Sequence, residues 1–147
     1  MNIRIAKQKD IKSISKLLFY LFSKEEEFDY NEKAQQKALK KIIKNKKIGI
    51  IFVATINKKV VASVNILYTY STALNSNVVI LEDMIVSPKF RGKNIGSKLL
   101  KYVFKYLKRK KIKRITLLSD QDNTKAHKFY DRLKFRRSQM CIYRKAL

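Results

Sequence analysis

Glycine and proline are scarce in this chain, and where they occur constrains its fold more than any other feature. The 147 residues contain three glycines and one proline, and Pro88, Gly92 and Gly96 lie close together. They separate the most apolar run, residues 78–86, from an amphipathic segment that begins at Ile95. Because glycine permits tight turns and close backbone contacts, this placement predicts a sharp turn between a buried strand and a helix.

The rest of the chain alternates between strand-like and helix-like patterns. Runs of β-branched and aromatic residues predict strands over residues 3–5, 48–56, 60–70, 78–86 and 112–118, and a terminal strand over 135–143. Apolar residues at spacings of three and four predict helices over residues 11–21, 32–44, 95–107 and 123–133. Asp10 is the expected N-cap of the first helix. This order predicts an α/β or α+β sheet with helices on both faces.

Length and composition favour one soluble domain over residues 1–147. The 46% of hydrophobic residues can supply a core, and no apolar run reaches the roughly 18 residues that a membrane span needs. One cysteine excludes an internal disulfide framework and a cysteine-rich zinc site, and Cys141 is expected in the core of the terminal strand. The first residues lack the long apolar stretch of a signal peptide. We therefore expect a cytoplasmic protein without a membrane partner.

The chain is strongly basic, with 35 Lys+Arg against 11 Asp+Glu and a formal net charge of +24. Two interpretations stay open: a lysine-biased composition that gives a solvated surface, or a polyanionic ligand or partner. Several carboxylates cluster between Glu25 and Glu32. They can receive a cationic substrate, or cap a helix and relieve local repulsion.

The turn after Pro88 is the strongest candidate binding site. It reads Arg91-Gly92-Lys93-Asn94-Ile95-Gly96-Ser97, and Asn94 tolerates a positive φ. A turn that feeds a helix start exposes unpaired N–H groups, which suit a phosphate or pyrophosphate. The spacing matches neither the ATP-binding GxxxxGK[ST] loop nor GxGxxG. The alternative is a turn that binds nothing.

These residues resemble the acetyl-CoA loop of the GNAT acetyltransferase superfamily, Arg/Gln-x-x-Gly-x-Gly/Ala, with Asn94 at the middle glycine. A second stretch resembles the later signature of the same family through Asn123, Ala126, Phe129, Tyr130, Leu133 and Phe135. There Lys134 replaces the usual glycine. The resemblance implies a mixed sheet of about six to seven strands with about four helices on both faces. It also implies a splay between the fourth and fifth strands.

The implied function is acetyl-CoA-dependent N-acetyl transfer, directly to the primary amine of a small molecule and without a metal. An acceptor amine on a protein or an aminoacyl-tRNA, and a non-catalytic CoA-binding protein, are the alternatives. Nucleic acid is not the favoured partner, and a homodimer is left open because family members often form dimers. The acceptor itself is not identified; its pocket is expected from the segments 19–30 and 68–77.

The resemblance also assigns roles to residues. Pantetheine would bond to backbone groups of Met84, Ile85 and Val86, and the pyrophosphate to the amides of residues 91–97. Asn123 and Tyr130 complete the cofactor contacts, and Tyr130 is the expected general acid. The base is Glu82, with Asp83 or water as alternatives, and strand alternation predicts that only one of the two carboxylates faces the site. His127 is expected as an exposed helix residue.

Overall fold

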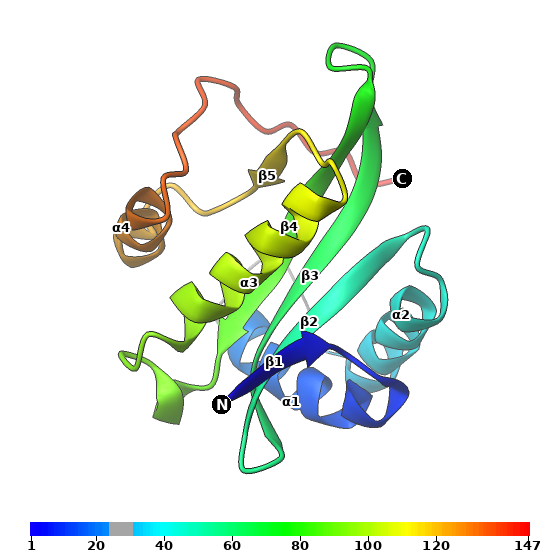
Figure 1. The fold of residues 1–147 in the computed structure, drawn as a ribbon, viewed down its shortest axis with the longest axis vertical. Coiled ribbons are helices and arrows are strands. Elements are labelled where there is room, and N and C mark those ends of the chain that lie inside the picture. The colour runs from blue at the N-terminus through cyan, green and yellow to red at the C-terminus, as the bar shows by residue number, and fades with distance from the viewer. Residues whose placement is uncertain (24–30) are drawn as a thin grey trace.

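The computed structural model describes residues 1–23 and 31–147, and these residues form a sheet flanked by helices on both faces (Figure 1). In chain order the elements are β1 (Asn2–Ile5), η1 (Gln8–Asp10), α1 (Ile11–Phe22), α2 (Glu32–Lys44), β2 (Gly49–Ile56), β3 (Lys59–Ser71), β4 (Ser76–Val86), η2 (Pro88–Phe90), α3 (Ile95–Arg109), β5 (Ile115–Leu117) and α4 (Thr124–Arg132). None of these helices is long and apolar enough to cross a membrane.

The sheet has five strands in the order β1-β2-β3-β4-β5. The first four pair antiparallel, whereas β4 and β5 pair in parallel. That parallel pairing covers only Val79–Leu81 opposite Ile115–Leu117, and β4 then continues to Val86 without β5 beside it. The predicted splay between the fourth and fifth strands is therefore confirmed.

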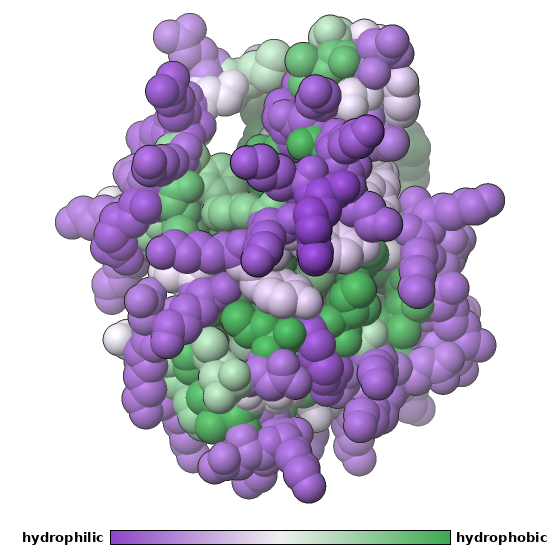
Figure 2. Space-filling model, viewed as in Figure 1, coloured by the Kyte–Doolittle hydropathy of each residue, from purple (hydrophilic) through white to green (hydrophobic). Residues whose placement is uncertain are grey.

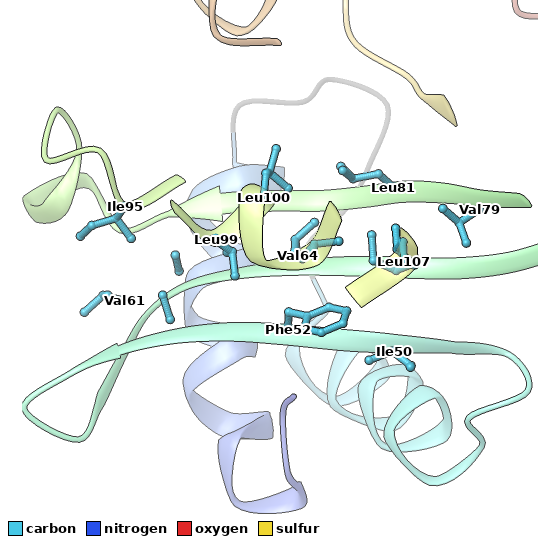
Figure 3. Close-up of a cluster of buried hydrophobic side chains, with 14 residues drawn as sticks. Ile50, Phe52, Val61, Val64, Val79, Leu81, Ile95, Leu99, Leu100 and Leu107 are labelled. Carbon is cyan, nitrogen blue, oxygen red and sulfur yellow. The ribbon is translucent and has the colours of Figure 1, made fainter. Parts of the chain in front are cut away.

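Two apolar cores lie on opposite faces of the sheet. Alternate residues of β2 divide between them, with Phe52 on one face and Val53 on the other, both fully buried. On the first face α3 packs through Leu99, Leu100 and Val103 (Figure 3). On the second face α1 and α2 supply Ile14, Leu17, Leu18 and Leu39. Helices therefore cover both faces of the sheet, as the apolar strands predict.

Asp10 occupies the N-cap position of α1, as expected, but its side chain does not cap that helix. The chain enters a short 3-10 turn before α1, so the Asp10 backbone is already helical and its side chain makes no capping bond to α1. The buried carboxylate instead accepts hydrogen bonds from Arg4 Nη1 at 2.6 Å, Arg4 Nη2 at 2.9 Å and the Lys7 backbone N–H at 2.7 Å. The bond from Arg4 holds the pKa of Asp10 below its usual range.

The predicted terminal strand over 135–143 is wrong. The described residues form five strands rather than six to seven, and after α4 the chain is irregular (Figure 1). The apolar run there is interrupted by Arg136 and Arg137, and β5, with only 3 residues, offers little edge for pairing. Cys141 is consequently exposed rather than part of the core.

Candidate functional site

A β-bulge interrupts the pairing of β3 with β4 beside the splay. Ser63 pairs with Ile85 and Asn65 with Glu82, so Asp83 and Met84 lie opposite Val64 alone. Asp83 takes a φ of 51°, a conformation uncommon for residues other than glycine. Bulges bend a strand and redirect its side chains. The bulge therefore re-aims β4 where it separates from β5.

The bulge changes the expected orientation of the two carboxylates. Glu82 is the register partner of Asn65, and partners in an antiparallel pair share a face. The Asp83 carboxylate accepts a hydrogen bond from Nδ2 of the same Asn65 at 2.5 Å. Both carboxylates therefore lie beside Asn65 on one face of the sheet, rather than on opposite faces as strand alternation predicts. Sequence reasoning missed Asn65, although an amide inside an apolar strand was a usable signal.

The backbone of β4 after the bulge presents polar groups to the open edge. The Ser87 N–H donates to the Val61 carbonyl at 2.8 Å, so the backbone N–H and C=O groups of Ser87 point toward β3. Those of Ile85, two residues earlier, point the same way. Because backbone groups alternate in direction along a strand, the N–H and C=O groups of Val86 and Met84 point toward the splay. Arg91 Nε donates to the Val86 carbonyl at 3.1 Å. Of the three predicted backbone contacts, Met84 and Val86 face the open edge and Ile85 does not.

The turn between η2 and α3 gathers hydrogen-bond donors. Gly92 has a φ of 74° and Asn94 a φ of 60°, which confirms the predicted left-handed conformation of Asn94. The backbone N–H groups of residues 92–97 donate to no acceptor among the described residues. The side chains of Arg91 and Lys93 are exposed beside them. Successive free N–H groups, a helix N-terminus and two cations together form a site suited to an anion.

Gly96 allows the first turn of α3 to approach its neighbours closely. A Cβ atom at this position would lie 3.2 Å from Cε of Met84 and 3.3 Å from Cζ of Phe129. Gly96 therefore brings the turn at residues 91–97 against β4 on one side and against α4 on the other. Phe129 in turn packs against Tyr130, with ring centroids 5.2 Å apart.

Both ends of α4 are fixed by local hydrogen bonds. Asn123 caps the first turn, its Oδ1 accepting from the Ala126 N–H at 3.1 Å. At the other end the Phe135 N–H donates to the Tyr130 carbonyl at 3.1 Å and the Lys134 N–H to the Asp131 carbonyl at 2.9 Å. This is a Schellman motif, and Lys134 takes its left-handed position with a φ of 65°. Lys134 thus takes the left-handed C-terminal position that glycine most often occupies.

The Tyr130 ring is held between Phe129 and Phe135 and packs against the core under α3. The Phe135 ring centroid lies 5.5 Å from that of Tyr130. Burial raises the pKa of Tyr130 to about 12, and its hydroxyl bonds to none of the described residues. The phenol therefore keeps its proton at neutral pH. It lies on the α3 face of the sheet, whereas Asn65, Glu82 and Asp83 lie on the α1 face, and the splay lies between.

His127 has a structural role. Its Nε2 is 2.8 Å from the Asp120 carbonyl oxygen, and Nδ1 contacts the Arg137 guanidinium. These contacts tie α4 to the segments before and after it. Among residues 1–23 and 31–147 no three His, Cys, Asp or Glu side chains come close enough to hold a metal ion.

The predicted acceptor region is only partly described. Phe19 and Tyr20 are exposed at the end of α1, with ring centroids 5.8 Å apart, and line a shallow hollow together with Lys16 and Glu32. Tyr70 is exposed and donates to Asn75 Oδ1 at 2.9 Å. Glu25, Glu26, Glu27, Phe28, Asp29 and Tyr30, which also belong to the predicted acceptor region, lie outside the described residues.

Lys134→Gly should stabilise the protein. A left-handed backbone costs a non-glycine residue about 1–2 kcal/mol, and glycine loses roughly 0.5–1 kcal/mol of chain entropy in return. The expected net gain is about 0.5–1 kcal/mol, or ~1–4 °C in Tm by calorimetry. Lys128→Gly, inside α4, should instead lose about 1 kcal/mol. Equal destabilisation by both changes would contradict the strain at Lys134.

Comparison with known proteins bears on what this arrangement does. The profile of the Acetyltransferase (GNAT) family matches residues 15–135. The chain belongs to the GNAT family of acetyltransferases. This GNAT protein is 30% identical over 134 residues to a Bacillus subtilis (strain 168) protein described as an uncharacterized N-acetyltransferase, YhfO, covering 89% of this chain and 87% of that one.

Solved structures agree with the GNAT fold. One, described as a possible acetyltransferase from Clostridium difficile 630, gives a TM-score of 0.83 at 24% identity and covers 99% of this chain and 97% of that one. An aminoglycoside 6'-N-acetyltransferase from Acinetobacter haemolyticus gives 0.83 at 17% identity, covering 100% and 99%. At these identities the likeness concerns the fold alone.

Proposed function

We propose that this GNAT protein is an acetyl-CoA-dependent N-acetyltransferase that acts on the primary amine of a small molecule. The observation that carries the proposal is the run of N–H groups at residues 92–97 that donate to none of the described residues. Arg91 and Lys93 lie beside this run, which follows the splayed end of β4 and η2. A diphosphate matches this set of donors and charges.

The residues fit the rest of the donor as well. Amide groups of the pantetheine arm can pair with the backbone of Met84 and Val86 along the open edge of β4, as a β5 strand would. The CoA thioester supplies an acetyl group activated for attack. Arg91 also fixes the Val86 carbonyl, so it links the turn to this edge.

The proton balance assigns roles to both faces of the splay. An ammonium acceptor first loses one proton to Glu82, or to Asp83 or water, and that proton passes to solvent. The neutral amine attacks the thioester carbonyl, and the C–S bond breaks as the N–C bond forms. Tyr130 donates its proton to the leaving sulfur and regains one from the nitrogen of the new amide. Because a phenol of pKa about 12 is a weaker acid than a thiol, the two transfers at Tyr130 must be coupled.

The basic surface supports acetyl-CoA as the donor and an amine as the acceptor. Hydrophilic side chains project over most of the face in Figure 2, and the formal charge is +24. Between described residues the structure has a single ion pair, Arg4–Asp10, so the charge is largely uncompensated. A positive field attracts an anionic donor and disfavours the protonated form of an amine.

Calorimetry with acetyl-CoA tests donor binding. The double variant Arg91→Ala/Lys93→Ala should weaken binding about 100-fold or more at low salt, since each charge-assisted contact contributes roughly 1.5 kcal/mol or more. The loss should shrink as salt screens the site. Lys46→Ala/Lys47→Ala, which removes the same charge after α2, is the matched control and should change affinity less than threefold.

An amine panel tests catalysis. Free CoA thiol is followed with polyamines, amino sugars, amino acids, peptide N-termini and aminoacyl-tRNA as acceptors. Product from a small amine supports the proposal, whereas product only from peptides or aminoacyl-tRNA would replace the acceptor class. Tight acetyl-CoA binding without turnover would identify a CoA-binding protein, and no binding at millimolar acetyl-CoA would end the proposal.

A further inference from the structure

Asn65 is a buried amide in a strand whose neighbours are apolar. It is 4% exposed, and Val64 and Ile66 on either side are completely buried in the core under α3. Burying an amide is unfavourable unless it is hydrogen-bonded. Its Nδ2 finds a charged acceptor, the Asp83 carboxylate on the neighbouring strand. The bond therefore satisfies a buried donor and fixes the direction of a carboxylate at the same time.

The bond joins the two strands at the bulge. Asp83 is one of the two residues that face Val64 alone, and its positive φ is disfavoured for an aspartate. A carboxylate on such a backbone has several directions open to it unless a partner selects one. Asn65, pinned on the regular strand β3, is a partner that does so.

We propose that Asn65 is a positioning residue, which holds the Asp83 carboxylate in one direction on the α1 face of the sheet so that Asp83 receives the ammonium proton of the acceptor. The inference rests on the proposed function and decides between the carboxylates that it leaves open. A donor N–H favours the ionised form of Asp83, because only the anion accepts the charge-assisted bond in full. An ionised carboxylate attracts an ammonium group and orients its nitrogen toward the thioester.

Among the described residues, the titratable group next to Asp83 in the chain is Glu82, and the test must control for it. Glu82 precedes Asp83 and pairs with Asn65, and it is solvent-exposed. On α1, which covers this face, the charged residues Lys12 and Lys16 are exposed as well. On β3 the register partner of Ile85 is the neutral Ser63. The experiments are therefore repeated in a Glu82→Gln background.

The experiment compares Asn65→Leu, Asn65→Asp and the matched control Ser63→Ala, a buried polar residue on the same face of β3. With an amine found active in the panel, Asn65→Leu should lower acceptor kcat/KM about 10-fold to 100-fold, the value of one hydrogen bond to a charged group. The acid limb of its pH profile should move to higher pH. Asn65→Asp should move that limb further, because two adjacent carboxyls cannot both ionise easily.

Two further readouts separate positioning from mere structural support. The first is acetyl-CoA affinity by calorimetry, which should stay within threefold in every Asn65 variant. The second is a double variant: Asn65→Leu should add less than threefold to the loss of acceptor kcat/KM that Asp83→Asn causes alone. A purely structural Asn65 would lower Tm but leave the pH profile in place. The proposal would be overturned if the acid limb of the pH profile did not shift. It would also be overturned if the kcat/KM losses of Asn65→Leu and Asp83→Asn multiplied in the double variant.

A measurement without an acceptor keeps the inference separate from the proposed function. Carboxyl ¹³C NMR of the ligand-free protein follows the titration of Asp83 directly. Asn65→Leu should shift that titration to higher pH, and Ser63→Ala should not. No shift overturns the role of Asn65 even if catalysis is found, whereas a failed amine panel beside a clear shift overturns only the proposed reaction.

Discussion

Tyr130→Phe should lower kcat for acetyl transfer about 100-fold or more while acetyl-CoA binding changes little. General acid catalysis contributes roughly 10²–10⁴-fold, and phenylalanine keeps the ring contacts with Phe129 and Phe135 but has no proton to give. Steady-state kinetics with an active amine, beside calorimetry with acetyl-CoA, measures the two effects separately.

The pH dependence follows from the raised pKa of Tyr130. The acid must be protonated to act, and a pKa of about 12 keeps it so through neutral and moderately alkaline pH. We therefore expect no loss of kcat through Tyr130 ionisation below about pH 11, above the usual phenol value of about 10. Tyr102→Phe, on α3 against Phe52, is the matched control and should keep full activity. Equal kcat in Tyr130→Phe and wild type would remove the acid role.

Gly96→Ile should destabilise the protein and damage the donor site together. A branched side chain at this position has no room between Met84 and Phe129, because a Cβ there would already lie 3.2 Å and 3.3 Å from their nearest atoms. Overpacking of this kind costs about 1–3 kcal/mol, or ~2–10 °C in Tm by calorimetry. Displacing the start of α3 should also weaken acetyl-CoA binding at least tenfold, because the N–H groups of residues 92–97 move with it.

Gly96→Ala is the graded control. Its Cβ meets only the ends of two side chains, which can shift by a few tenths of an ångström. Alanine also gains about 1 kcal/mol over glycine inside a helix. The variant should therefore stay within about 1 kcal/mol of wild type. Full acetyl-CoA affinity in Gly96→Ile would contradict the link between Gly96 and the turn.

Local signals were enough to place most elements and the turn. The periodicity of Leu99, Leu100 and Val103 marks the buried face of α3, and their side chains are buried there. Asn94 lies where the turn needs a positive φ, which its short side chain tolerates. The prediction of a terminal strand was wrong because an apolar run favours extended backbone but does not supply a neighbouring strand to pair with. β5 is too short to provide that edge.

The carboxylates mark where sequence reasoning stops. Alternation along β4 separates Glu82 from Asp83, but the bulge opposite Val64 brings both beside Asn65. A bulge depends on how two strands register, and the interaction of Asn65 with Asp83 crosses a separation of 18 positions. No pattern within one strand contains that information.

The sequence by itself determined the order of elements, the turn after Pro88 and the identity of its donors, because these depend on short-range propensity and backbone freedom. Tertiary structure alone decided which groups meet. It brought Phe129 against Gly96, Asn65 against Asp83, and the Met84 and Val86 backbone to an open edge, since those contacts arise from packing and strand pairing between distant segments.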